Sequence, residues 1–159
     1  LLRFFAGWDP GLPAMREKLK VSTLWGEAEF SGVADLMKSY KYRVDAAQLD
    51  VPELRGVLSC RRDFLLRLME NPNLLEHEQF TSLLMAVFHL AEELQARPEE
   101  GKLPESDVKH LAGDVDRVYG QLARQWLEYM NHLRRSYPYL FSLAVRTNPF
   151  DSGASPVVR

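Results

Sequence analysis

Apolar side chains recur every three or four residues through most of the chain, and this spacing constrains its fold more than any other feature. The clearest run spans residues 108–133 and consists of Val108, Leu111, Val115, Val118, Leu122, Trp126, Tyr129 and Leu133. A period near 3.6 residues places such positions on one face of an α-helix, close to the heptad spacing of packed helices. No segment shows the sustained alternation or the hairpin dipeptides that indicate strands. We therefore predict an all-α protein.

The turn signals between apolar runs predict a single-domain bundle of five or six helices over residues 1–159. Its expected parts are an N-terminal helical pair at 1–50, core helices at 51–97 and 105–136, and a C-terminal cap at 137–151. Asp50 is a good N-cap residue for the first core helix. A polar, Pro- and Gly-containing loop at 97–107 is the clearest break between core helices, and Pro138 stops or kinks the last of them.

Composition narrows the class of protein. With 159 residues, 46% of them apolar, the chain is long enough for one well-buried domain. The net charge of −2 argues against a nucleic-acid binder held by phosphate contacts, so we expect no nucleic-acid partner. The single cysteine, Cys60, excludes an internal disulfide and suits a cytoplasmic location. Cys60 falls in an apolar-periodic segment and is expected to be buried as a small hydrophobic residue.

Histidine and carboxylate side chains at helical spacing form the candidate metal ligands. His89 precedes Glu92 and Glu93 by three and four residues, and His110 precedes Asp114 by four. On a helix these offsets place the imidazole and the carboxylate on one face, within reach of one cation. The sequence places only His89 near the core, so His89, Glu92 and Glu93 are the predicted ligands. A hydrogen-bonded core histidine is the alternative interpretation of His89.

His110 and Asp114 are expected on the polar face of their helix, opposite Leu111, Val115 and Val118. Ordinary surface pairing between residues four apart would then explain them.

Recognisable catalytic machinery is absent from the sequence. It contains no Gly-rich phosphate loop, no nucleophile elbow, no C-x-x-C motif and no zincin helix. The sequence therefore favours a non-enzymatic function, leaves an enzymatic one open, and predicts no cofactor. The run "KSYKYRV" at 38–44 fits either an amphipathic core helix or a phosphate-binding segment that uses Lys38, Lys41 and Arg43.

The stretch "SYPYLFSLAVRTNPFD" at 136–151 carries many apolar and aromatic residues close to the C-terminus. It cannot expose them all without a large apolar patch, so we expect either a packed cap or a docking surface. Aromatic and arginine side chains dominate the energetics of protein interfaces. The predicted interaction residues are Arg134, Arg135, Tyr139, Phe141 and Arg146, and the expected partner is another protein or a second copy of the chain.

Two strings carry a family resemblance: "LLEHEQFTSLLMAVFHLAEEL" and "HLAGDVDRVYGQLARQWLEYMNHLRRSYPYLFSLAVRTNPFD". Over residues 54–151 the chain resembles a helical region of uncharacterised bacterial proteins. It is more loosely similar to the cytoplasmic helical regions that follow the pore in bacterial two-transmembrane, potassium-channel-like proteins. No pore signature is present. The resemblance implies attachment to a membrane protein, with the opening "LLRFFAGW" as what remains after a membrane segment, and it transfers no residue role.

The sequence therefore leaves two alternative predictions of function. The first is a non-enzymatic regulatory or assembly domain that acts by contact, with the cytoplasmic part of a bacterial membrane protein as one form of it. The alternative is a helical bundle that binds a metal ion or small ligand through His and Glu residues.

Overall fold

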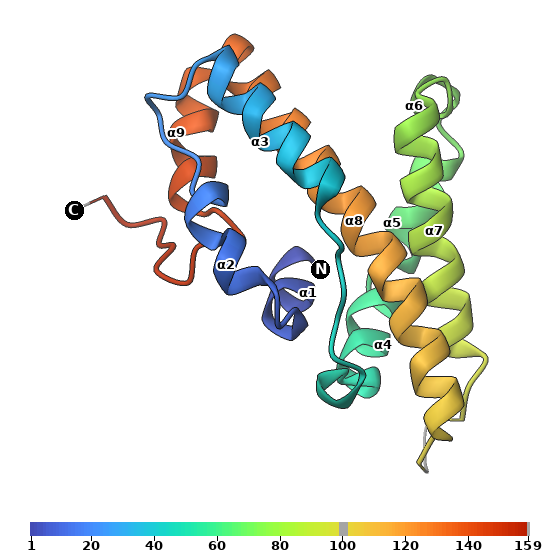
Figure 1. The fold of residues 1–159 in the computed structure, drawn as a ribbon. Coiled ribbons are helices and arrows are strands. Elements are labelled where there is room, and N and C mark those ends of the chain that lie inside the picture. Colours follow the sequence, from blue (N-terminus) through green and yellow to red (C-terminus); the bar gives the residue numbers. More distant parts are fainter. Residues whose placement is uncertain (99–101, 159) are drawn as a thin grey trace. The chain divides into compact units, whose positions relative to one another are not determined.

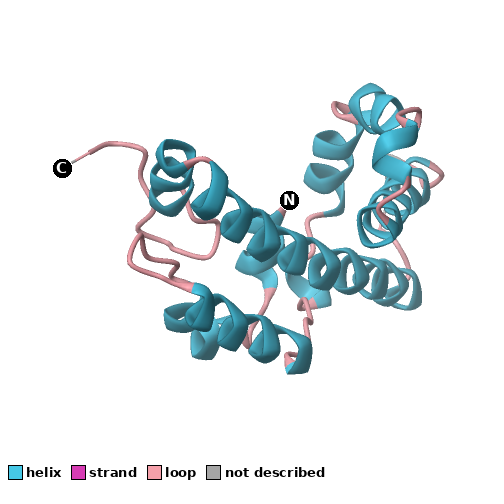
Figure 2. Ribbon diagram, turned by 90° about the horizontal axis from the view of Figure 1, so that it is seen from above, coloured by secondary structure: helices cyan, strands magenta, loops and turns pink. Residues whose placement is uncertain are grey.

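The computed structural model describes residues 1–98 and 102–158, and every regular element in this part of the chain is a helix (Figure 2). The α-helices are α1 (Leu2–Trp8), α2 (Leu12–Arg16), α3 (Glu27–Ser39), α4 (Val51–Ser59), α5 (Arg62–Met69), α6 (Pro72–Leu75), α7 (Glu78–Gln95), α8 (Glu105–Ser136) and α9 (Pro138–Arg146). Two 3-10 helices, η1 (Glu17–Leu19) and η2 (Ala46–Gln48), complete the set. The all-α prediction is confirmed. The predicted number of five or six helices is wrong, because the described residues form nine α-helices, several of them very short.

The chain divides into two compact units. The first unit comprises Leu1–Tyr42 and Leu122–Arg159, and the second comprises Arg43–Gln121. Helix α8 contributes its N-terminal part to the second unit and its C-terminal part to the first. This division does not test whether the chain folds as one unit, so the single domain stays a prediction.

In the second unit, α7 packs against α4, α5 and α6 (Figure 1). Helix α7 buries one wide apolar face, whose residues are Leu83, Leu84, Val87, Leu90, Ala91 and Leu94. The facing helices contribute Leu54, Leu58 and Leu65, and α8 contributes Leu111, Val115, Val118 and Tyr119. None of the described helices combines the length and the apolar character needed to cross a membrane.

The first unit contains a second apolar core. Residues 1–50, predicted as a helical pair, include three α-helices, because the opening "LLRFFAGW" forms α1 and buries Phe5 completely. Helix α8 ends at Ser136, so Pro138 stops this helix, the first of the two predicted alternatives, and it begins α9. Phe141 of α9 lies 6.4 Å from Phe30 of α3 between ring centroids, and Phe150 packs edge-on against Trp126 at 4.9 Å. The C-terminal stretch is therefore partly a packed cap.

Tertiary hydrogen bonds end α3 earlier than the sequence pattern predicts. The run at 38–44 is helical only through Ser39; Tyr40 has an extended backbone, and residues 40–45 form no regular element. In the first unit, the Tyr40 hydroxyl donates to Asp9 Oδ2 at 2.8 Å. In the second unit, the Val44 N–H donates to Asp116 Oδ1 at 2.7 Å. Such long-range bonds outweigh a modest helix propensity, so the predicted continuous core helix does not form here. Phosphate binding by Lys38, Lys41 and Arg43 stays a prediction.

Two local predictions around α4 have opposite outcomes. The Asp50 side chain accepts a hydrogen bond from the Glu53 N–H at 2.8 Å, so the predicted N-cap is confirmed. Cys60 was expected to be buried and is exposed, because α4 ends at Ser59 and places Cys60 at its C-cap. Helix α8 begins at Glu105, inside the predicted loop at 97–107, so that loop is shorter than predicted. Residues 99–101, including Glu99 and Glu100, lie outside the described residues.

Candidate metal centre

A ladder of polar side chains joins α7 to α8 within the second unit. His89 Nε2 lies 3.6 Å from Asp114 Oδ2, His110 Nε2 lies 3.5 Å from Glu93 Oε2, and Arg97 Nη2 lies 2.7 Å from Asp107 Oδ1. His89 and Glu93 are four residues apart on one face of α7, and Arg97 follows just beyond the end of that helix at Gln95. Their partners on α8 occur in the reverse order along the sequence, at Asp114, His110 and Asp107, as expected for antiparallel helices.

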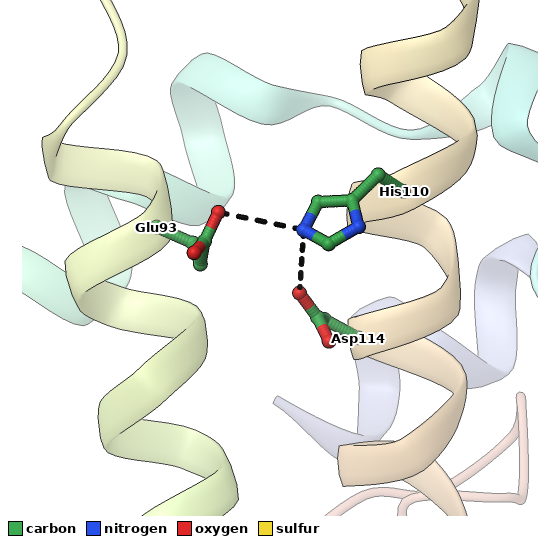
Figure 3. Close-up of side chains that lie close together, drawn as sticks. All are labelled: Glu93, His110 and Asp114. Carbon is green, nitrogen blue, oxygen red and sulfur yellow. Dashed lines mark ion pairs between the residues drawn. The ribbon is translucent and has the colours of Figure 1, made fainter.

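Glu93, His110 and Asp114 form the centre of this ladder. Their candidate ligand atoms all lie within 4.8 Å of one another. Figure 3 shows the three side chains pointing toward one another, Glu93 from α7 and the other two from α8. The Nε2 atom of His110 is 3.5 Å from Glu93 Oε2 and 3.5 Å from Asp114 Oδ2. One imidazole nitrogen therefore faces two carboxylate oxygens from different helices.

Asp114 is the most unusual member of the cluster, because it is a carboxylate with only 4% of its surface exposed. Its Oδ2 atom is buried and accepts no hydrogen bond from any residue that the structure describes. Its Oδ1 atom lies 3.4 Å from Arg117 Nη1, on a side chain that is mostly exposed. A buried polar atom without a hydrogen bond costs about 1–3 kcal/mol. A cation beside Oδ2 would remove that cost.

Arg97 orders the carboxylates at one end of the ladder. Its Nε and Nη2 atoms donate to the two oxygens of Asp107, both at 2.7 Å, and Nη1 donates to Glu93 Oε2 at 2.7 Å. These hydrogen bonds hold the pKa of Glu93 and of Asp107 below their usual values and raise the pKa of Arg97. Glu93 is therefore ionised and fixed in orientation, as a metal-binding carboxylate should be.

The structure assembles only part of the predicted ligand set. Glu93 lies in the cluster and His89 lies beside it, whereas Glu92 turns to another helix, with Oε1 3.2 Å from Arg62 Nη2. The interpretation of His89 as a core histidine is wrong, because 48% of its side chain is exposed.

The expectation that His110 and Asp114 both lie on the polar face of α8 is wrong for Asp114, which is 4% exposed, and holds for His110, whose side chain is 54% exposed. At about 100° per residue, Asp114 lies about 60° from Leu111 and about 40° from Val118 on the α8 surface. It therefore borders the apolar stripe and does not lie opposite to it. A signal was present in the sequence, since each of two consecutive helices carries a histidine and a carboxylate four residues apart.

The predicted interaction residues are mostly engaged within the first unit. Arg134 Nη2 lies 2.8 Å from Glu27 Oε2 and its guanidinium stacks over Phe30 at 5.7 Å, while Arg135 also pairs with Glu27. Phe141 is buried, and Arg146 donates to the Pro156 carbonyl oxygen. Tyr139 is the exception, with 93% of its surface exposed.

Residues 1–146 match the family model described as "Uncharacterized protein MJ1433, C-terminal helical domain". The chain belongs to this family. The uncharacterised protein MJ1433 of Methanocaldococcus jannaschii is 48% identical over 152 residues, which cover 96% of this chain. The chain spans 61% of the length of that relative. No solved structure matches the chain.

These matches refine the resemblance noted in the sequence. Similarity to a helical region of uncharacterised proteins is confirmed, but the relative found is archaeal and the bacterial assignment is not supported. The matches give no support to a resemblance to potassium-channel-like proteins. Since the MJ1433 names describe no chemistry, function must be argued from the side chains.

Proposed function

We propose that this helical domain binds a divalent transition-metal ion between α7 and α8, with Glu93, His110 and Asp114 as ligands. The observation that carries the proposal is the buried Oδ2 atom of Asp114, which has no hydrogen-bond donor among the described residues and faces an imidazole nitrogen. Burial of a carboxylate is costly unless a cation or a set of donors compensates it. Metal coordination provides that compensation.

The distances within the cluster suit a shared ion better than direct hydrogen bonds. A protein N–H···O bond usually spans about 2.7–3.2 Å, and His110 Nε2 is 3.5 Å from each of its two oxygen neighbours. Two ligands bound to one tetrahedral zinc ion at about 2.0–2.1 Å lie about 3.4 Å apart. The three side chains therefore need little rearrangement to bind one ion.

The chemistry of the donors selects among metals. A set that contains an imidazole nitrogen suits Zn²⁺ and neighbouring transition metals, whereas Mg²⁺ and Ca²⁺ prefer oxygen ligands alone. The Arg97 guanidinium fixes Glu93 through Oε2, which is the kind of outer hydrogen bond that orients ligands at metal sites. We therefore expect Zn²⁺ to bind in preference to Mg²⁺.

Calorimetric titration of the chelator-treated protein with Zn²⁺, followed by elemental analysis, tests the proposal. We expect one ion per chain. Replacing Glu93 by glutamine should weaken binding by about tenfold or more, because a neutral amide replaces a charged ligand.

Glu92→Gln is the matched control, since Glu92 is the next residue on α7 and pairs with Arg62 outside the cluster. Its affinity for Zn²⁺ should equal that of the wild-type protein. Absence of stoichiometric zinc in the wild-type protein would refute the proposal. Equal weakening by Glu92→Gln and Glu93→Gln would do the same.

A regulatory or assembly function remains a second proposal, favoured by the surface of α9. Its exposed apolar side chains are Tyr139, Leu140 and Leu143, which share one side of the helix. Exposed clusters of this kind mark contact surfaces in many proteins. Light scattering on the wild-type protein and on Tyr139→Ser tests it, and an unchanged mass at all concentrations in both would refute self-assembly.

A further inference from the structure

His89 approaches the proposed metal ligands from the α7 side. Its Nε2 atom lies 3.6 Å from Asp114 Oδ2 and 3.9 Å from Glu93 Oε1. Both separations exceed a normal hydrogen bond. They are close to the spacing of about 3.4 Å between two ligands of one tetrahedral zinc ion. His89 lies beside the three residues whose candidate ligand atoms are all within 4.8 Å of one another. Nearly half of its side chain is exposed, so its ring can turn toward the position of a fourth ligand.

The arrangement of the four side chains is balanced between the two helices. His89 and Glu93 are four residues apart on α7, and His110 and Asp114 are four residues apart on α8. Because the helices run antiparallel, each histidine faces the carboxylate of the other helix, at 3.6 Å and 3.5 Å. Four histidine–carboxylate separations, from 3.5 to 3.9 Å, thus connect all four residues.

The charges of such a set also balance. Two carboxylates and two neutral imidazoles around a divalent ion carry no net charge, which suits a position that includes a carboxylate as deeply buried as Asp114. Two nitrogen and two oxygen ligands are compatible with tetrahedral Zn²⁺.

We infer that His89 is the fourth protein ligand and that the ion is a closed, four-coordinate cross-link between α7 and α8. This inference rests on the metal binding proposed above and goes beyond it in assigning the coordination and the role. Catalytic zinc sites keep one position open for water, whereas structural sites are filled by four protein ligands. A site closed by His89 binds the two helices together and provides no metal-bound water as a nucleophile.

Reconstitution of the full chain with Co²⁺ reports the coordination number directly. Tetrahedral Co²⁺ absorbs visible light much more strongly than five- or six-coordinate Co²⁺. We expect strong absorption from the wild-type protein. In His89→Ala, water replaces the imidazole as the fourth ligand, so the absorption bands should shift, and the affinity for Co²⁺ should fall by about tenfold or more.

His77→Ala is the matched control, because His77 is exposed at the N-cap of α7, away from the cluster. Its Co²⁺ spectrum should be that of the wild-type protein, and far-ultraviolet circular dichroism should show that both variants retain their helices.

Two outcomes separate the proposals. If the wild-type protein binds Co²⁺ with a spectrum and affinity that His89→Ala leaves unchanged, His89 is not a ligand, and the inference fails while metal binding stands. If the wild-type protein binds no Co²⁺ and no Zn²⁺, the proposed function fails as well.

Discussion

Replacing Asp114 by asparagine should stabilise the metal-free protein and abolish its response to zinc. The buried Oδ2 atom accepts no hydrogen bond from the described residues, and burial of such an oxygen without a donor lowers the stability of the fold when no metal is bound. Asparagine keeps the shape of the side chain and removes the charge. Its amide can also donate to a neighbouring imidazole nitrogen, which a carboxylate cannot do.

The expected change in the free energy of unfolding follows from the contacts of the two carboxylate oxygens of Asp114. Relief of the unsatisfied atom contributes about 1–3 kcal/mol. Loss of the ion pair with Arg117, whose side chain is 59% exposed, costs no more than about 1 kcal/mol. The net gain is then between about 0 and 3 kcal/mol, with a midpoint near 1.5 kcal/mol. For a chain of this length, 1 kcal/mol moves the unfolding temperature by about 2–4 °C, so the midpoint corresponds to an increase of roughly 3–6 °C.

Thermal unfolding followed by circular dichroism, with chelator and then with excess Zn²⁺, provides the assay. A free zinc concentration one hundred times the dissociation constant should stabilise the wild-type protein by about 2.7 kcal/mol and leave Asp114→Asn unchanged. Asp114→Asn should therefore be the more stable protein in chelator, and the wild-type protein should be the more stable one in excess Zn²⁺. A variant that is less stable than the wild-type protein in chelator, or that keeps its full zinc response, would refute this reasoning.

Three further predictions concern the described contacts. Arg97→Met should lower the free energy of unfolding of the metal-free protein by about 1–3 kcal/mol, because it removes charged hydrogen bonds from Asp107 and Glu93; chemical denaturation measures the loss. That difference between wild-type and variant proteins should shrink as the pH falls from neutral to about 3. The pKa of Asp107 is lowered in the folded state, so the stability it contributes is present above its usual pKa and is lost as the pH falls toward the lowered one; a constant difference would contradict the assignment. Phe141→Ala should cost about 3–5 kcal/mol and Tyr139→Ala less than about 0.5 kcal/mol, because Phe141 is buried and Tyr139 exposed; equal losses in thermal denaturation would show that α9 does not pack as described.

The long elements could be predicted from the sequence because their signals are local. Helix α8 shows the apolar period over its whole length, and Pro138 marks the start of α9. The short elements could not be predicted in the same way. Isolated helices of fewer than about 12–15 residues are marginal in water, so the ends of α1, α2 and α6 depend on tertiary contacts that the local pattern does not contain.

The candidate site also has one part that the sequence predicts and one part that it does not. The pairs of histidine and carboxylate four residues apart were visible on both helices, and they were sufficient to suggest a cation. The sequence did not reveal which helices are neighbours or how they are aligned. That alignment brings Glu93 to His110 and turns Glu92 toward Arg62. Adjacent residues on a helix point about 100° apart, so only the packing could choose between the two glutamates.

The exposed position of Cys60 makes the protein convenient for labelling. It is the only cysteine in the sequence and lies at the C-cap of α4. A maleimide dye or a nitroxide would therefore attach at one defined point, on the same unit as α7. A surface thiol also forms disulfide-linked dimers in air, and thiolates are good zinc ligands. Mass measurements accordingly need a reductant, and Cys60→Ser is the better parent protein for every titration with metal.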